Sequence, residues 1–389
     1  MVNSLAVLRE TKRDAKGREV ENRVVLTPTL VKSLKAQCPE LDVFVERGAG
    51  AKIDCPDEAY QAAGASICSH EEALRKDLII GVKETRSEDF PKLSSGNIFM
   101  SFQHFAESRQ RTESALKTGT TYVAWETMET KTDGHPFFPC LAPMSEAAAK
   151  IVARHADEYA LFSKKIITSG LPETGLQGTK VAILGGGSVG RTAAEEFSER
   201  GCEVTLLDKN ADWARSLAKY FKDHEIRFPK VKVLEVTPEN LRAAVREAFF
   251  LVSAMYTAGK KPEKLVSSDL LKTMIPGGCV YPVDIDQGGG VEGVIETSIL
   301  EPFDLPVIPG TKVFFFAPPN LPSMGARTAS EALGTIVLPY VVEIIRKGLA
   351  QAAENDPVIA SGINIRGGQI VHPGLASVFP MLRDGSRTA

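Results

Sequence analysis

The stretch Lys180-Val-Ala-Ile-Leu-Gly185-Gly-Gly187-Ser-Val-Gly190 decides the fold of this chain. A short apolar run, typical of a buried parallel strand, leads directly into the pattern G-x-G-x-x-G. Apolar residues then recur at helical spacing until Gly201, and a second apolar run over 203–207 predicts the next strand. This order of strand, glycine loop, helix and strand is typical of a Rossmann-type unit.

The positions of this motif fit a pyrophosphate. Gly185 permits the tight turn, Gly187 lets the backbone approach the phosphates, and Gly190 lets the helix pack on the strand. The helix begins at Ser188 and Val189, and its N-terminus faces the phosphate charge. Asp208, at the end of the second strand, can accept a hydrogen bond from the ribose 2′-hydroxyl. The motif predicts a dinucleotide site; the alternative is a tight glycine turn that binds no ligand.

Length and composition limit the kinds of protein that the chain can be. Its 389 residues suggest two to three domains, and 43% hydrophobic residues suffice for large cores. A net charge of −3 without a dense basic run argues against nucleic acid and anionic membrane surfaces. We see neither an apolar run of the ~18 residues that would span a bilayer nor a signal peptide. Six scattered cysteines without C-x-x-C predict free thiols in the cytoplasm and no metal site.

The rest of the chain alternates predicted strands and helices, as in a doubly wound sheet. In the first part we expect strands at 5–8, 42–46, 78–82, 97–102 and 121–125, and helices from Thr27 or Thr29 to 36, at 56–63 and at 108–117. Arg23 is expected to lead into a further strand at 24–26, and the segment 134–139 is expected to be a loop. The first half therefore predicts an α/β domain of its own.

The second half continues the dinucleotide domain. A helix is expected over 143–162 and a loop over 168–175, followed after the glycine motif by strands at 231–236, 249–253, 279–285 and 313–316. A long helix over 332–347 should kink or break at Pro339. The last forty residues are expected to be helix and then loop. They are too short to fold alone, so they should pack on another domain.

Ligands of open α/β sheets bind outside the carboxyl ends of the strands. Lys83, His104 and Glu126 are expected at such ends in the first domain, and Asp286 in the second. If the two sheets face each other across a cleft, these side chains converge beside the nicotinamide, and Arg23 can join them. Each also has an ordinary explanation: a surface charge for Arg23 and Lys83, a structural histidine, an ion pair for Glu126 and a turn for Asp286.

Seven segments carry a resemblance to a known family. They are Glu21-Asn-Arg-Val-Val-Leu-Thr-Pro, Val82-Lys-Glu, His104-Phe-Ala-Glu, Ala142-Pro-Met-Ser-Glu, Leu184-Gly-Gly-Gly-Ser-Val-Gly, Ile285-Asp-Gln-Gly-Gly and Asn320-Leu-Pro. In these segments, which occur in the same order from the N-terminus through Asn364, the chain resembles the alanine dehydrogenase and transhydrogenase family. Lysine-forming saccharopine dehydrogenase is similar more distantly, in the N-terminal Arg-Glu-Thr-Lys and Leu-Thr-Pro segments.

The resemblance implies two Rossmann-like domains with a cleft between them. Residues 1–142 and 345–389 would form the substrate domain, and 143–344 the NAD-binding domain. It implies NAD(H), a small 2-oxo or amino acid, and a homo-oligomer, either dimer or hexamer. It assigns substrate binding to Arg23 and Lys83, acid/base chemistry to His104, an active-site carboxylate to Asp286, ribose binding to Asp208, and a place near the nicotinamide to Asn320. Glu126 is expected among the substrate-binding residues.

Three departures leave the substrate side chain open. The family has a small residue where this chain has Asp284, it has a glycine-rich run where this chain has 163–169, and the match around Ser323-Met-Gly-Ala is loose. We expect an NAD-dependent amino-acid dehydrogenase, which reduces an imine formed from a small 2-oxo acid. One alternative is a saccharopine- or opine-like dehydrogenase that acts on a secondary amine. Another is a catalytically silent NAD(H)-binding subunit, as in transhydrogenase; the presence of Arg23, Lys83, His104 and Asp286 favours an enzyme.

Overall fold

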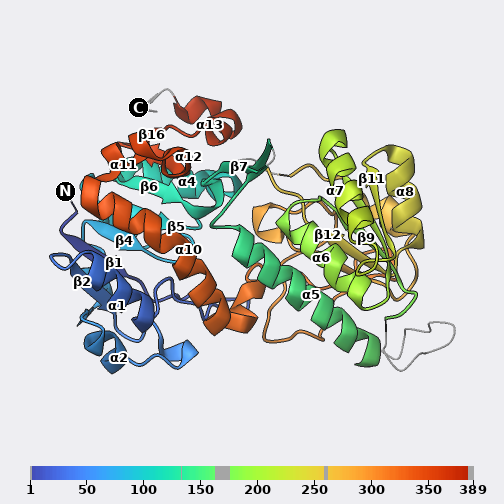
Figure 1. Ribbon diagram of the computed structural model, residues 1–389, viewed down its shortest axis with the longest axis horizontal. Coiled ribbons are helices and arrows are strands. Elements are labelled where there is room, and N and C mark those ends of the chain that lie inside the picture. Colours follow the sequence, from blue (N-terminus) through green and yellow to red (C-terminus); the bar gives the residue numbers. More distant parts are fainter. Residues whose placement is uncertain (1, 133, 163–175, 258–261, 384–389) are drawn as a thin grey trace. The chain divides into compact units, whose positions relative to one another are not determined.

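The computed structural model describes residues 2–132, 134–162, 176–257 and 262–383, which form two compact units (Figure 1). Unit 1 comprises Met1–Met144 and Gly325–Ala389, and unit 2 comprises Ser145–Thr257 and Lys261–Met324. Residues 163–169, which stand where the family has a glycine-rich run, and the expected loop at 168–175 lie outside the described residues. The domain boundaries expected from the sequence place 325–344 with the dinucleotide domain, whereas compactness groups these residues with unit 1.

Unit 1 contains an eight-stranded sheet in the order β16-β15-β6-β5-β4-β1-β2-β3. Its six parallel strands are β1 (Ser4–Val7), β2 (Asp42–Glu46), β3 (Ser66–Cys68), β4 (Leu78–Ile80), β5 (Ile98–Ser101) and β6 (Thr121–Ala124). From β3 to β6 the order is that of a Rossmann sheet, so its topological switch point lies between β1 and β4. Two antiparallel strands from the end of the chain, β15 (Ile363–Arg366) and β16 (Gln369–Ile370), extend the sheet beyond β6.

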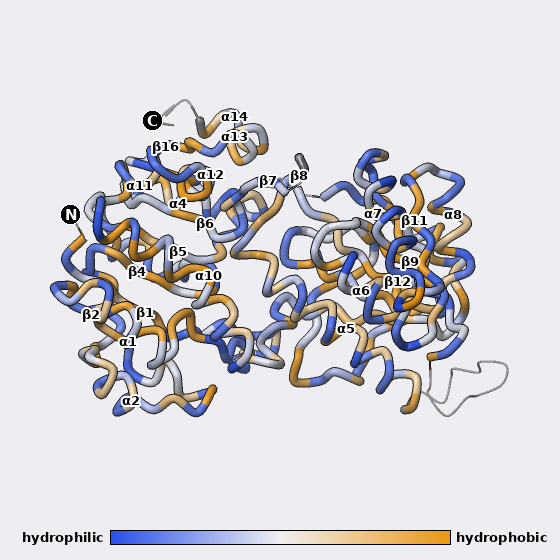
Figure 2. Tube along the Cα trace, viewed as in Figure 1, coloured by the Kyte–Doolittle hydropathy of each residue, from blue (hydrophilic) through white to orange (hydrophobic). Residues whose placement is uncertain are grey.

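Successive residues of these strands point to opposite faces, and their buried apolar side chains form two clusters, one on each face. In Figure 2 the strands are coloured mostly as hydrophobic. One face packs on α1 (Pro28–Gln37), α2 (Asp57–Ala62), α10 (Ala326–Lys347), α11 (Leu349–Asn355) and α12 (Pro357–Gly362). The other packs on α3 (His70–Ala73), α4 (Arg109–Thr118), α13 (Pro373–Val378) and α14 (Pro380–Arg383). Unit 1 is therefore a three-layer α/β structure.

Unit 2 repeats this architecture with a six-stranded parallel sheet in the order β11-β10-β9-β12-β13-β14. The strands are β9 (Lys180–Leu184), β10 (Glu203–Asp208), β11 (Val231–Glu235), β12 (Phe250–Ser253), β13 (Cys279–Pro282) and β14 (Phe314–Phe315). One face packs on α5 (Ala142–Phe162), α6 (Ser188–Glu199) and α7 (Ala211–Asp223), and the other on α8 (Pro238–Glu247) and α9 (Ser268–Leu271). Its switch point lies between β9 and β12.

The predicted α/β class with two Rossmann-like domains is confirmed, but several predicted elements are wrong. Residues 24–26 form no strand: the Val24 N–H donates to Ser330 Oγ of α10 at 3.0 Å, so the segment lies against a helix. The expected loop at 134–139 contains β8 (His135–Phe137), which pairs with β7 (Thr130–Thr132). The strand expected over 279–285 ends at Pro282, and the 3₁₀ helix η5 (Ile285–Gln287) follows.

Helix α10 also differs from expectation. It begins at Ala326, earlier than expected, and runs through Pro339 without a break. It packs closely on unit 1, because a Cβ on Gly334 would lie 2.5 Å from the Val25 carbonyl oxygen. Together with the turn before it, α10 is, by length and composition, apolar enough to span a membrane, a feature that we did not expect from the sequence. Half of its most apolar 18-residue stretch is buried inside the structure, which fits a core helix.

Candidate active site

Three of the predicted site residues follow neighbouring strands of the first sheet. Lys83, His104 and Glu126 come shortly after β4, β5 and β6, and all three are buried. Because these strands are parallel, their carboxyl ends lie at one edge of the sheet. The structure brings Lys83 and His104 together through Glu84, whose Oε1 lies 2.8 Å from His104 Nδ1 and 3.7 Å from Lys83 Nζ.

Glu84 is the centre of a buried charge cluster. Lys12 Nζ lies 3.7 Å from its second oxygen, so two lysines and a histidine surround one carboxylate. Burial acts to raise the pKa of Glu84, but Lys83, Lys12 and His104 outweigh it and hold this pKa well below the usual range. Glu84 is thus a stable anion that can orient the imidazole of His104.

The backbone of His104 is held in an uncommon conformation. Its φ of 46° is left-handed, a conformation that costs free energy in any residue with a side chain. Glu126 Oε1 accepts the His104 N–H at 2.7 Å, and Arg111 Nη1 donates to the His104 carbonyl oxygen at 3.3 Å. Glu126 also accepts the Gln103 N–H. Glu126 thus holds the backbone at His104, and the substrate-binding role expected for Glu126 stays a prediction.

Arg23 lies buried beside a second carboxylate. Its Nε and Nη2 each donate to Glu21 at 2.7 Å, and its Nη1 lies 3.1 Å from Met144 Sδ. Burial acts to raise the pKa of Glu21, but the charges of Arg23 and Lys83 lower it on balance. The bidentate pair fixes the guanidinium, whose planar fork suits a ligand carboxylate.

Glu10 follows β1 at the switch point of the first sheet. Its Oε1 accepts the Val82 N–H at 2.6 Å. Burial and the charge of Glu21 raise the pKa of Glu10 to about 7, although the N–H groups of Val82 and Lys83 act to lower it. A carboxyl group with such a pKa can exchange a proton near neutral pH.

The carboxylates Glu10, Glu21 and Glu84 were not among the residues predicted from the sequence. Glu84 adjoins Lys83, and Glu21 lies two residues before Arg23, so proximity to these candidates was a usable signal. Their pairings depend on tertiary contacts between separate loops, which no sequence pattern displays.

The glycine loop of unit 2 has the geometry that a dinucleotide needs. Gly185 has a φ of 93°, and a Cβ there would lie 2.5 Å from the Ala254 carbonyl oxygen. A Cβ on Gly190 would lie 1.7 Å from the Gly185 oxygen, so only glycine lets α6 start so close to β9. Around Gly187 a Cβ would meet no described atom within 4 Å. The turn exposes Gly187 before Ser188 and Val189 begin α6, which fits phosphate binding at a helix N-terminus.

Asp208 ends β10 and contacts the same loop. Its Oδ2 accepts the Gly186 N–H at 2.7 Å, and its Oδ1 accepts the Asn210 N–H at 2.8 Å. Trp213 Nε1 donates to the Gly186 carbonyl oxygen at 2.9 Å. The neighbouring Lys209 is paired with Glu263 at 2.6 Å, so its charge is partly balanced. The acidic strand end thus lies against the glycine loop, and its expected role in ribose binding stays a prediction.

The other two predicted residues of unit 2 lie in loops. Asp286 belongs to η5 and is partly exposed, and Asn320 is buried just before η6 (Leu321–Gly325). The roles expected for both residues stay predictions. Among the residues that the structure describes, no group of three or more His, Cys, Asp or Glu side chains can hold a metal ion.

Two Rossmann-like sheets, the second with a complete glycine loop and an acidic strand end, define a dinucleotide-binding protein of two α/β domains. Family models agree: alanine dehydrogenase/PNT, N-terminal domain, matches residues 6–148, and the C-terminal domain of the same family matches residues 149–373.

Individual proteins resemble the chain over nearly its whole length. Alanine dehydrogenase of Halomonas elongata is 32% identical over 370 residues, covering 93% of this chain and 95% of that protein. Alanine dehydrogenase of Methanococcus maripaludis is 33% identical over 366 residues, covering 93% and 94%. A solved L-alanine dehydrogenase superposes with a TM-score of 0.79 at 30% identity, covering 97% and 99%.

The chain belongs to the alanine dehydrogenase/PNT family. As a member of it, the protein is an oxidoreductase that uses NAD(H).

Proposed function

We propose that this protein is an alanine dehydrogenase, which interconverts L-alanine with pyruvate and ammonia. The observation that carries the proposal is the buried Lys83–Glu84–His104 cluster, which combines a cation for a carbonyl oxygen with an oriented imidazole. The alanine dehydrogenases that match this chain over more than nine tenths of its length support the choice of substrate.

Unit 1 binds the substrate in this proposal. Glu21 holds the Nε–Nη2 edge of the Arg23 guanidinium, and the remaining Nη N–H groups donate to the substrate carboxylate. Lys83 polarises the keto oxygen, so that ammonia adds to the carbon and water leaves. His104 moves the protons of these steps, with its ring oriented by Glu84 and its backbone held by Glu126.

Unit 2 binds the nucleotide, with the pyrophosphate at Gly185, Gly187 and Gly190 and the ribose at Asp208. NADH, when bound, supplies the hydride that reduces the imine carbon. Asp286 stabilises the cationic amine, and Asn320 contacts the nicotinamide end. We also propose a cytoplasmic homo-oligomer, as the family resemblance implies.

The test is NADH oxidation with a panel of 2-oxo acids, each with and without ammonia. We expect pyruvate with ammonia to react fastest. Turnover that requires a second amino acid in place of ammonia would instead support the secondary-amine dehydrogenase. Tight NADH binding without turnover on any acid would support the silent subunit and overturn the proposal.

Two variants test the assignments within unit 1. Arg23→Ala removes a contact present in both the ground and the transition state, so the KM for pyruvate should rise most. His104→Ala removes proton transfer, so kcat should fall by about 10²–10⁴-fold while NADH binding persists. A His104→Ala protein with a lowered Tm but normal kcat would show that His104 is only structural.

A further inference from the structure

Asp284 stands where the family has a small residue, and the sequence alone gives it no role. Its side chain is buried, with 5% of its surface exposed. It follows β13 and immediately precedes η5, the turn that carries Asp286. A buried carboxyl group is costly unless its oxygens are hydrogen-bonded, so its contacts need an explanation.

Three donors from two separate loops converge on one oxygen of this carboxylate. Asp284 Oδ2 accepts the Ser253 hydroxyl at 2.7 Å, the Gly290 N–H at 3.1 Å and the Met255 N–H at 3.3 Å. Ser253 is the last residue of β12, Met255 lies in the loop after it, and Gly290 lies beyond Asp286. The Asp284 carbonyl oxygen accepts the N–H groups of Gln287 and Gly289 at 3.0 and 2.9 Å.

The packing around these bonds leaves little freedom. A Cβ on Gly290 would lie 2.9 Å from Ser253 Oγ and 2.0 Å from Met255 Cε, the flexible end of that side chain, so this loop packs closely on the end of β12. The loop after β12 also lies close to the glycine loop, because the Ala254 carbonyl oxygen would lie 2.5 Å from a Cβ on Gly185.

We propose that Asp284 is a positioning residue whose carboxylate holds the Asp286 loop against the end of β12 and so fixes the catalytic carboxylate in place. The inference rests on the proposed function, because it is the assigned role of Asp286 that makes this loop part of the catalytic machinery. Small misplacement of a catalytic group costs rate without a new contact to substrate.

Ionisation makes this role testable. Burial raises the pKa of Asp284 to about 6, although Ser253 and the N–H groups of Met255 and Gly290 act to lower it. Oδ1 is buried and has no hydrogen-bond partner among the described residues, so a proton can sit there while Oδ2 still accepts. The neutral acid accepts weaker bonds than the carboxylate. The loop should therefore loosen as pH falls through about 6.

Among the described residues, the segment at the end of β12 brings two groups to Asp284 that do not titrate, Ser253 and Met255. The same segment also carries the phenol of Tyr256. The Asp284 loop itself carries Asp286, and Lys264 Nζ donates to its Gly288 and Val291 carbonyl oxygens.

The experiment compares the full-length protein with Asp284→Asn, Ser253→Ala and the exposed-acid control Asp269→Asn. Asp284→Asn can keep an oxygen at the Oδ2 position and thus imitates the protonated acid at every pH. We expect its kcat with pyruvate and ammonia to fall at least about tenfold at pH 8, with the Kd of NADH within about threefold of wild type. Ser253→Ala removes a contact that lowers the pKa, so its acid-side loss of kcat should begin at higher pH. Asp269→Asn should behave as wild type.

Amide hydrogen exchange over 285–291 provides a readout that needs no activity. We expect faster exchange there in Asp284→Asn at pH 8 and, after correction for the intrinsic rate, in wild type at pH 5 relative to pH 8. Unchanged exchange in Asp284→Asn would overturn the inference, as would a variant with lower Tm and normal kcat. If wild type reduces no 2-oxo acid, the proposed function fails by itself, and exchange still decides whether Asp284 holds the loop.

Discussion

At the scale of single residues, His104 is constrained at both its ring and its backbone. Glu84 contacts Nδ1, and Glu126 accepts the N–H of a residue whose φ is 46°. Backbone strain of this kind persists only where surrounding contacts maintain it, and it is concentrated at functional sites. The ring and the backbone of His104 are therefore positioned by two glutamates, and the charge of one of them can be removed with little change in shape.

Glu84→Gln keeps the size of the side chain but removes its charge. The imidazole loses the anion that orients it, so we expect kcat to fall on the order of 10–100-fold. The surface variant Glu113→Gln, which loses only an exposed pair with Arg109, should keep its kcat. The measurement is steady-state kinetics beside a thermal melt on one preparation. Normal turnover by Glu84→Gln would exclude an orienting role for Glu84.

At the scale of elements, the end of β10 and the glycine loop form one structure. Asp208 accepts the N–H of Gly186, and Trp213 from α7 donates to the carbonyl oxygen of that same residue. The acid that should select the ribose is therefore fixed to the loop that should bind the pyrophosphate.

Asp208→Ser should reduce the preference for NADH over NADPH. A carboxylate accepts a hydrogen bond from the 2′-hydroxyl and repels a 2′-phosphate, so we expect the ratio of kcat/KM values to fall by on the order of tenfold or more. Asp223→Ser, an exposed acid of α7, should leave the ratio unchanged. A ratio that does not fall in Asp208→Ser would remove the ribose assignment.

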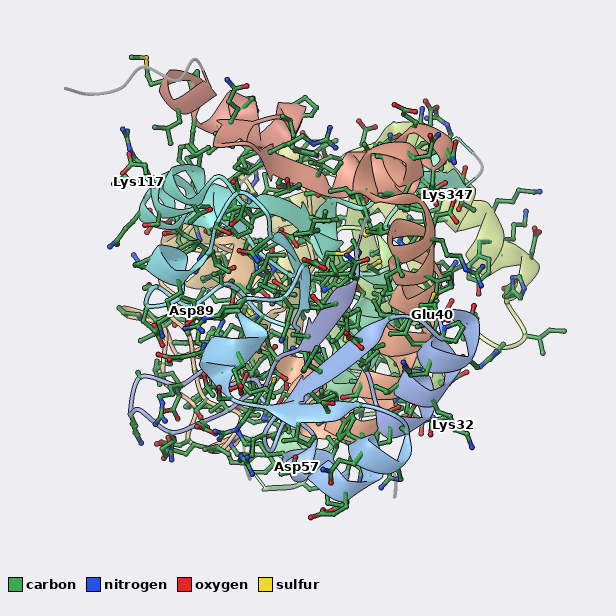
Figure 3. All side chains as sticks on the ribbon, turned by 90° about the vertical axis from the view of Figure 1, so that its left-hand side faces the viewer. Lys32, Glu40, Asp57, Asp89, Lys117 and Lys347 are labelled. Carbon is green, nitrogen blue, oxygen red and sulfur yellow. The ribbon has the colours of Figure 1, made fainter. Side chains whose placement is uncertain are left out.

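A second element-scale feature is the ion cluster that joins α3 to β2. His70 Nε2 lies 2.8 Å from Asp89 Oδ1, and its Nδ1 lies 3.1 Å from Glu46 Oε2. Asp89 is labelled in Figure 3, which draws the side chains with unit 1 facing the viewer. Hydrogen bonds to Asp89 and Glu46 raise the pKa of His70 to about 9.

This raised pKa predicts a stability that depends on pH. A group whose pKa is higher in the folded protein contributes its full stabilisation below its unfolded pKa, about 6.5, and loses it as pH rises through about 9. His70→Gln should therefore destabilise the protein at pH 6, on the order of 2 kcal/mol, and much less at pH 10. Thermal melts of both proteins at the two pH values measure this. A Tm difference that stays constant between pH 6 and 10 would contradict it.

At the scale of the whole molecule, regular periodicity was predictable and long-range pairing was not. The β9–α6–β10 unit and the strands β1, β2, β4, β5 and β6 follow from apolar runs between turn residues. The run at 24–26 looks like a strand because any fully buried segment is apolar, yet the Val24 N–H donates to Ser330 of α10 instead of to a neighbouring strand. Strand β15 pairs with β6, whose residues lie more than two hundred positions earlier in the chain, and no local pattern displays such a pairing.

The same limit applies to the candidate site. Single candidates at strand ends could be selected because parallel strands align their carboxyl ends. The pairing of carboxylates with basic groups could not be predicted, because Glu84 contacts Lys12 and His104 only after three loops come together. In the sequence, Asp284 appeared only as a departure from the family pattern. Two of its three donors, Ser253 and Met255, lie about thirty residues before it along the chain.

The assembly state is also a property of the whole molecule. Soluble oligomeric enzymes are mostly closed symmetric homo-oligomers, and we expect a dimer or hexamer here. Light scattering after size-exclusion chromatography, over a hundredfold range of concentration, measures it. A monomer at every concentration would contradict the expectation.

The antiparallel strand β15 has a consequence for synthesis. It pairs with β6, opposite Val123, and helix α10 of the same late segment covers the first sheet. The strands of unit 2, in contrast, all lie between 180 and 315. On the ribosome the domain encoded second can therefore close its sheet before the domain encoded first. Until residues 363–366 emerge, β6 remains an open edge that a chaperone or another nascent chain can reach.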